Sequence, residues 1–145
     1  MKAITIYQPW ATLIALGEKR YETRGWKTNY RGPIAIHASK NIDHQAALMV
    51  ARNCPEIWRK ISPLPTGCVV AVAELVECWS VHLYQNVEIY LHEGVGGGTR
   101  SIDPQEEKFG WYEPGRYAWE LANMRKIDPV PAKGQQGLWN WGGER

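Results

Sequence analysis

The chain has 145 residues, enough for one domain with its own core, and we expect a single domain over residues 1–145. Its 17 basic and 15 acidic residues give a net charge of +2. That balance excludes a histone-like or nonspecific DNA binder, because such proteins need many phosphate contacts. The chain has eight Trp and seven Tyr but only one Phe. Trp and Tyr combine an apolar ring with a polar atom, so they suit partly exposed positions and ligand-binding surfaces.

The sequence shows no membrane span, no signal peptide and no metal-ligand spacing. The three cysteines, Cys54, Cys68 and Cys78, are odd in number and form no CxxC pair, which predicts reduced thiols. The four histidines are scattered, so we predict neither a metal nor another cofactor. We therefore expect a cytoplasmic protein that does not contact membranes, with a monomer favoured over an oligomer.

The first third of the chain alternates strands with a short helix. Apolar and polar residues alternate over Ala3–Tyr7, which predicts a strand. A short helix is predicted over Pro9–Leu16, because proline suits a first helical turn and Gly17 is a natural helix stop. Alternation over Lys19–Trp26 and Ile34–His37 predicts two further strands.

The middle of the chain carries two helices and the longest strand signal. Asp43 predicts the N-cap of a helix from about residue 44 to residue 53, and a second short helix follows Pro55. The segment Cys68–Cys78 is apolar on both faces, so it is predicted to be a central strand.

The last third is less regular. We expect a flexible loop at Gly94–Gly98, a short helix opening at Asp103 and a strand over Arg116–Met124 that Pro129–Pro131 breaks. A loop and strand over Lys133–Trp141 end the chain. About six strands with two or three helices predict an α+β domain built as a small barrel with helices at its ends.

The polar pattern at the second predicted strand is the main candidate site. Residues two apart on a strand share a face, so Arg20, Glu22 and Arg24 point the same way. Lys19 points the opposite way unless the helix–strand junction bends the register. An acid and an arginine on one face can pair and present a guanidinium fork to a phosphate or a base edge. The alternative is a salt bridge on a solvated strand.

Four segments together resemble the ASCH (activating signal cointegrator homology) family. They are Tyr7–Ala11, the G-x-K-x-x-E-x-R pattern of Gly17–Arg24, the segment Gly32–Lys40 ending in His-Ala-Ser-Lys, and Gly115–Trp119 with Gly134–Trp139 behind it. The resemblance implies a PUA-like β-barrel of about five to seven strands with two or three helices. It also implies a polar cleft that binds single-stranded RNA, a nucleoside or a nucleotide through Lys19, Glu22 and Arg24.

Three residues outside that pattern are further candidates for the cleft. The amide of Gln8 can read a base edge, and the alternative is a helix-cap hydrogen bond. Ser39 and Lys40 can hold a phosphate, and the alternative is a polar loop. Nearby His37 is interpreted as a satisfied, half-buried histidine rather than a catalyst.

Aromatic residues offer stacking surfaces for a base. Trp26 and Trp119 are predicted to bind ligand in this way, with Trp139 and Trp141 as further candidates, although core packing is expected for most of the four. Glu74 interrupts an apolar strand, so we expect a buried partner for a cation or a general base of raised pKa.

Two enzymatic alternatives remain open. Some small members of the family are amidohydrolases of N4-acylated cytidine that use a Lys, a Thr nucleophile and a Glu. Lys19 matches the Lys, but Glu22 occupies the Thr position, so the hydroxyl nucleophile is missing. If the chain is an enzyme, Lys19 and Glu22 are its candidate catalytic residues. The further Glu is taken as Glu74, with Glu88 and Glu93 as alternatives. The other alternative is a metal-independent ribonuclease for single-stranded RNA.

Overall fold

A computed structural model describes residues 1–93 and 97–143. The predicted glycine loop at Gly94–Gly98 falls partly on residues 94–96, which lie outside the described residues. The strands are β1 (Lys2–Gln8), β2 (Tyr21–Arg24), β3 (Gly32–Ile42), β4 (Cys68–Tyr84), β5 (Glu88–His92), β6 (Thr99–Ser101), β7 (Tyr117–Pro131) and β8 (Leu138–Asn140). The helices are α1 (Trp10–Ala15), α2 (His44–Asn53), α3 (Pro55–Ile61) and α4 (Pro104–Lys108). None of these helices combines the length and the hydropathy that crossing a bilayer requires.

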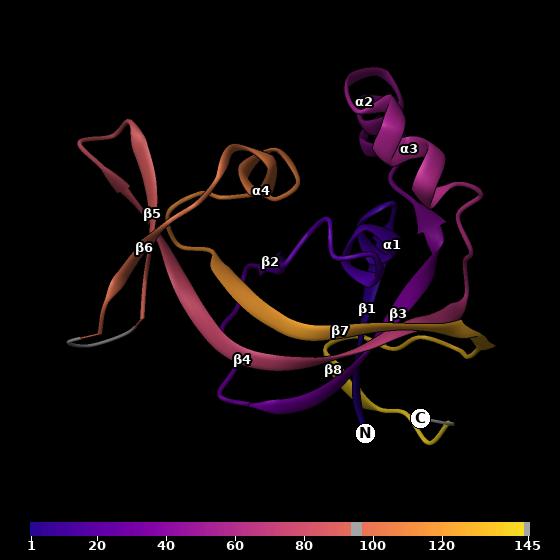
Figure 1. Ribbon diagram of the computed structural model, residues 1–145. Helices are drawn as coiled ribbons and strands as arrows, with labels where there is room; N and C mark the ends of the chain where they lie inside the picture. The colour runs from indigo at the N-terminus through magenta and orange to yellow at the C-terminus, as the bar shows by residue number, and fades with distance from the viewer. Residues whose placement is uncertain (94–96, 144–145) are drawn as a thin grey trace. The chain divides into compact units, whose positions relative to one another are not determined.

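The strands form one mixed sheet, which confirms the α+β fold class. They pair in the order β2-β7-β4-β3-β1-β8, and β5 adds to β4 and β6 to β5 (Figure 1). The β1–β3 pair is parallel, whereas β1–β8, β2–β7 and β4–β5 are antiparallel. Within the described residues the path from β2 to β8 is open and contains six strands, and β5 and β6 bring the sheet to eight, more than the about five to seven predicted for a small barrel.

Contacts within the chain divide it into two compact units. The first unit comprises Met1–Glu18, Pro33–Ala73 and Met124–Arg145. The second comprises Lys19–Gly32 and Glu74–Asn123. Both β4 and β7 contribute residues to each unit. A single domain over residues 1–145 stays a prediction.

The first unit is built around β1. This strand lies between β3 and β8, with Ile4 opposite Ile36 in the parallel ladder. The buried side chains that join these strands to β4 and to the end of the chain are Ala3, Ala35, Val69, Trp139 and Trp141. The Trp139 indole N–H donates to Thr5 Oγ1 at 3.0 Å, so a large aromatic ring is buried with its polar atom satisfied.

Helix α1 ends as the sequence predicts, at Gly17. Gly17 has φ +78°, and its N–H donates to the Ile14 carbonyl at 3.0 Å. The next N–H, from Glu18, donates to the Leu13 carbonyl at 2.9 Å. These two bonds form a Schellman motif, which ends the helix. The residue that follows is Lys19, the first charged residue of the candidate site.

Helices α2 and α3 begin where the sequence predicts. The Asp43 carboxylate accepts a hydrogen bond from the Ala46 N–H at 3.0 Å, which caps α2. Pro55 stands in the first turn of α3, where a missing N–H costs nothing. The two helices pack side by side (Figure 1).

The second unit contains β2, the β4–β5 hairpin and β6. In the β2–β7 ladder Glu22 lies opposite Trp119 and Tyr21 opposite Glu120. The core of the unit consists of Tyr21, Trp79, Val81, Leu91, Tyr112 and Ala118. Tyr21 therefore anchors one face of β2 in the core, which fixes the direction of the neighbouring side chains of that strand.

Two features of the second half differ from the prediction. The β4–β5 hairpin was not predicted, because its turn uses Gln85 and Asn86 at positive φ in place of a glycine signal. Strand β7 also runs through Pro129–Pro131 rather than ending before them. β2 pairs with Tyr117–Glu120, the first four residues of β7. The later residues of β7 therefore have no β2 partner, and proline is tolerated where a strand lacks a partner on one side.

Candidate functional site

The charged residues of the G-x-K-x-x-E-x-R pattern meet at the start of β2. Glu22 and Arg24 share a face of the strand, and Arg24 Nε lies 3.0 Å from Glu22 Oε2. This is the ion pair that the spacing predicts. The Glu22 side chain is 11% exposed and the Arg24 side chain 24%, so the guanidinium is oriented and a ligand can still reach it.

Lys19 lies beside the same carboxylate, although it is an odd number of residues away. Lys19 precedes β2, which begins at Tyr21, so the alternation of side chains along the strand does not apply to it. The side chain is 1% exposed. Burial lowers the pKa of Lys19, and the carboxylates of Glu22 and Glu106 act in the opposite direction by favouring its charged form. Lys19 is thus a buried cation between two acids.

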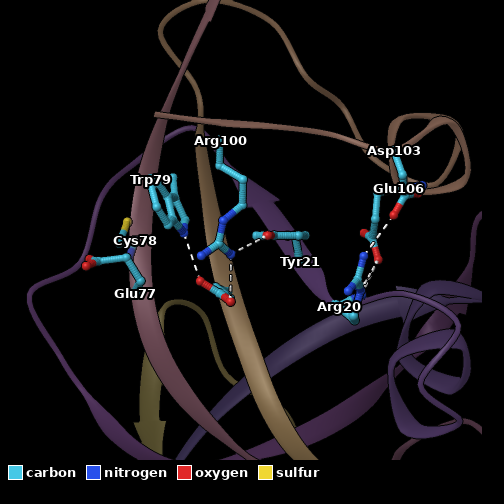
Figure 2. Close-up of polar contacts among 9 residues, drawn as sticks. Arg20, Tyr21, Glu77, Cys78, Trp79, Arg100, Asp103 and Glu106 are labelled. Atoms are coloured by element: carbon cyan, nitrogen blue, oxygen red, sulfur yellow. Dashed lines mark hydrogen bonds and ion pairs between the residues drawn. The ribbon is translucent and has the colours of Figure 1, made fainter. Parts of the chain in front are cut away.

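Glu106 is a site residue that the sequence reasoning missed. It lies in α4, which Asp103 caps by accepting from the Glu106 N–H at 2.9 Å. Its Oε2 accepts from the Arg20 backbone N–H at 2.6 Å, and the Arg20 side chain reaches it at 3.5 Å (Figure 2). Burial raises the pKa of Glu106, opposed by those bonds and by Lys19. An acid two residues after Asp-Pro is a common helix start, so no sequence signal marks it as functional.

Glu106 and Tyr112 each bring a buried polar atom without a partner. Within the described residues, Glu106 Oε1 and the Tyr112 hydroxyl have no hydrogen-bond partner. Burial raises the pKa of Tyr112, and the nearby carboxylates of Glu106 and Glu22 act in the same direction. The hydroxyl therefore stays protonated and can donate. Unsatisfied buried atoms are costly, and such atoms often mark a place where a ligand binds. We call Lys19, Glu22, Arg24, Glu106 and Tyr112 the signature cluster.

The predicted stacking residues divide into core and surface. Trp119 is fully buried, and its indole N–H donates to the Trp26 carbonyl at 3.3 Å. The prediction that Trp119 binds ligand is therefore wrong, because a ring with no exposed area cannot stack on a base. Trp26 is 39% exposed and packs edge-to-face on Trp119 at 4.8 Å. Trp139 and Trp141 are core residues.

The expected burial of Glu74 is also wrong. In β4 the buried residues alternate with exposed ones from this position on, so Glu74 and Val76 point to solvent while Leu75 points inward. A carboxylate that points to solvent does not serve as the buried partner of a cation. The buried acids of the site are Glu22 and Glu106.

Gln8 is a structural residue rather than a reader of bases. It is fully buried, and its Oε1 accepts from the Thr12 N–H at 2.9 Å. Its Nε2 donates to Thr12 Oγ1 and to the Pro65 carbonyl, both at 2.7 Å. The amide caps α1 and fastens the loop after α3, so the helix-cap alternative holds and the predicted ligand contact is corrected.

Ser39, Lys40 and His37 lie on β3, in the first unit. Ser39 is buried and accepts from the Asn41 N–H at 3.0 Å, whereas Lys40 is exposed. The His37 ring donates through Nε2 to the Ala132 carbonyl at 2.7 Å and packs edge-on against Trp139. It is 1% exposed rather than half-buried, and its Nδ1 has no hydrogen-bond partner within the described residues. The placement of Ser39 and Lys40 in a common cleft with the signature cluster stays a prediction.

A second polar cluster lies in the same unit as the signature cluster. Figure 2 shows Arg100 between Trp79 and Tyr21, with the guanidinium 4.5 Å from the centre of the indole ring. Arg100 donates to the Tyr21 hydroxyl and to Glu120, both at 2.9 Å, and Trp79 donates to Glu120 at 3.0 Å. These bonds raise the pKa of Arg100. The charges of Arg100 and Glu120 are paired within the cluster. The cluster therefore holds Tyr21 and β2 in place.

A cavity of about 380 Å³ lies between the second cluster and α4. It is lined by Arg20, Tyr21, Arg100, Ser101, Ile102, Asp103 and Glu106. Arg20 pairs there with Asp103 at 2.8 Å, so the cavity walls are charge-compensated. Among the described residues, no three His, Cys, Asp or Glu side chains gather as a metal site would require.

On this α+β sheet the site combines a buried lysine between two acids with an arginine that one of those acids orients. The ASCH domain family matches residues 4–131, so this chain belongs to that family. Activating signal cointegrator 1 from Homo sapiens is 30% identical over 84 residues, which are 53% of this chain and 14% of that protein. The Mus musculus protein of the same name is 29% identical over 89 residues, 57% of this chain and 15% of that protein.

The chain thus corresponds to about a seventh of the length of these two relatives. Among solved structures, a crystal structure of a mutant ZmASCH protein from Zymomonas mobilis resembles it with a TM-score of 0.47 and 15% identity. The similarity covers 90% of this chain and 74% of that one.

Proposed function

We propose that the signature cluster binds single-stranded RNA or a nucleoside or nucleotide. The observation that carries the proposal is the ion pair of Glu22 and Arg24 at 3.0 Å beside the buried Lys19. A guanidinium held in one orientation and 24% exposed presents its donors to a phosphate or a base edge without first having to be ordered.

The other members of the cluster supply complementary contacts. The Tyr112 hydroxyl is a donor, and Glu106 Oε1 is an acceptor if the acid is ionised, each without a partner among the described residues. Both types of group are needed to read the Watson–Crick edge of a base, which carries donors and acceptors side by side. Trp26 is proposed as an aromatic wall, and Ser39 and Lys40 as further phosphate contacts.

Hydrolysis of a modified nucleoside, or metal-independent RNA cleavage, is a second candidate function. The observation that favours it is the pKa pair: burial lowers the pKa of Lys19 and raises that of Glu106, as in many acid–base sites. In amide hydrolysis Glu106 would accept the proton of the attacking water, and Lys19 would donate one to the leaving nitrogen.

The cytoplasm remains our predicted compartment because of the three free thiols.

One set of assays tests the binding proposal. We expect saturable binding of a fluorescent single-stranded oligoribonucleotide or of a nucleotide, weakened about tenfold or more by Arg24→Ala through loss of charged hydrogen bonds. Arg52→Ala removes the same charge from the exposed end of α2 and should leave affinity unchanged. Absence of saturable binding to any of these ligands contradicts the proposal.

The same preparations separate the catalytic alternatives. Incubation with N4-acetylcytidine reports amide hydrolysis, and incubation with end-labelled RNA reports strand scission. Turnover that is lost in Glu106→Gln supports the second candidate, whereas binding without turnover leaves the chain as a binding module.

A further inference from the structure

Trp111 is the most exposed tryptophan in the described part of the chain. It is 58% exposed and follows α4, one residue before Tyr112 of the signature cluster. Arg116 lies over one face of its ring, with the guanidinium carbon 3.9 Å from the ring centroid. The large exposed fraction leaves much of the indole in contact with solvent. A largely exposed indole with a cation stacked on its ring is a candidate stacking surface for a base.

This surface is fixed to the signature strand by hydrogen bonds. The Trp111 N–H donates to Thr23 Oγ1 at 3.0 Å, and Thr23 lies between Glu22 and Arg24. Arg116 Nε donates to the Trp111 carbonyl at 2.9 Å, and Arg116 Nη2 donates to the Thr23 carbonyl at 3.2 Å. Both the ring and the guanidinium are therefore held in place before any ligand arrives, which lowers the entropy cost of binding.

The charge around this surface suits a phosphate group. Burial lowers the pKa of Arg116, and Arg24 acts in the same direction because its like charge is near. Glu113 and Glu22 act in the opposite direction. In the β2–β7 ladder Arg24 lies opposite Tyr117, the residue that follows Arg116 in the chain. Within the described residues, Arg116 Nη1 donates to no acceptor, so it can bind an anion.

We propose that Trp111 and Arg116 form a second subsite, which stacks the base next to the nucleotide held at the signature cluster. Arg24 and Arg116 then flank the phosphate that links the two nucleotides. The inference rests on the proposed function and narrows it: the ligand is single-stranded RNA of at least two nucleotides, rather than a free nucleoside. A base and its phosphate match a tryptophan face beside an arginine better than an apolar or an acidic ligand does.

Binding of cytidine 5′-monophosphate and of a short oligocytidylate, measured with the full chain, tests this inference. We expect Trp111→Ala to weaken oligomer binding by about 5- to 150-fold, the usual loss for one stacked base. Mononucleotide binding should change less than about twofold, because the mononucleotide occupies only the signature cluster. The substitution should leave the fold intact, since Trp111 holds Thr23 and Arg116 through its backbone atoms.

Two further variants control the experiment. Trp111→Tyr keeps an aromatic face and should restore most of the oligomer affinity. Tyr84→Ala removes an equally exposed aromatic ring, 59% exposed, at the end of β4 in the same unit, and should have no effect. Thermal unfolding of each variant checks that it folds.

The other outcomes show whether the second subsite alone fails or whether the proposed function fails with it. If the wild type binds both ligands and Trp111→Ala alters neither affinity, the subsite is refuted and the proposed function stands. If Trp111→Ala weakens both ligands equally, the ring belongs to the signature cluster and the second subsite is refuted. If the wild type binds neither ligand, both the proposed function and the subsite are contradicted.

Discussion

At the scale of single residues, the site depends on how buried charges are compensated. Lys19 is 1% exposed, and an isolated ammonium at that depth would be strongly disfavoured. The acids Glu22 and Glu106 offset that cost, one from β2 and the other from α4. The pairing of Glu22 with Arg24 could be predicted from the sequence, because both residues belong to one strand. Glu106 could not, because its contact with Lys19 depends on how α4 packs against β2.

The role of Glu22 can be separated by one isosteric change. If Glu22 only orients Arg24, Glu22→Gln should weaken RNA or nucleotide binding by at most about fivefold, since the amide still accepts a hydrogen bond from the guanidinium. If the chain hydrolyses a nucleoside with Glu22 as general base, the same change should lower turnover by about 100- to 10,000-fold with binding nearly intact. We expect the first result in a titration that follows binding and product release together. Full loss of turnover at unchanged affinity would contradict the orienting role.

The buried state of Lys19 predicts a pH dependence of stability. Its folded pKa lies below the ordinary value of 10.5, so between the two values the unfolded chain holds more protons than the folded one. The free energy of unfolding should therefore gain a contribution that rises with pH toward 10.5, by up to about 1.4 kcal/mol per pH unit. Lys19→Met removes that rise.

Urea unfolding at several values from about pH 8 upward measures it. Lys60→Met is the control, because Lys60 is 61% exposed and pairs with Glu18 at 3.4 Å. The difference between wild type and Lys19→Met should grow as pH increases, and a difference independent of pH would show that Lys19 titrates normally.

At the scale of elements, local signals predicted the starts of α2 and α3 and the end of α1. Asp43, Pro55 and Gly17 each act within one helical turn, so their effect can be read from neighbouring residues. The β4–β5 hairpin was missed because Gln85 adopts positive φ without the usual glycine, at a position that the pairing of the two strands imposes. The pairing of the two strands, rather than a local sequence signal, determines the β4–β5 hairpin, so the sequence shows no pattern for its turn.

The Gly17 turn offers a test at this scale. Gly17→Ala puts a side chain at φ +78°, where nothing lies within 4 Å of the added atom, so the cost is backbone strain alone. We expect a loss of about 1–2 kcal/mol in the free energy of unfolding by chemical denaturation. Gly142→Ala is the matched control, with equal space and no positive φ. An unchanged stability in Gly17→Ala would mean that the turn relaxes and that the positive φ of Gly17 is not required.

At the scale of the whole molecule, the balanced composition and the local site lead to a prediction about salt. The net charge of +2 is too small for a protein that binds through many phosphate contacts, whereas Arg24 and Arg116 are proposed to contact a phosphate. For single-stranded RNA, two phosphate contacts predict a plot of log K against log salt with a slope of about −1.4. Arg116→Met should reduce that slope by about 0.7. A much steeper slope would indicate an extended surface elsewhere.

The central claim is tested most directly by a crystal structure of the chain with a short single-stranded oligoribonucleotide. The account predicts a nucleotide against the signature cluster, with Arg24 on its phosphate, Tyr112 or Glu106 bonded to its base, and the adjacent base stacked on the Trp111 ring. RNA bound in the cavity between Arg20 and Arg100 instead, with Arg24 and Tyr112 untouched, would contradict it.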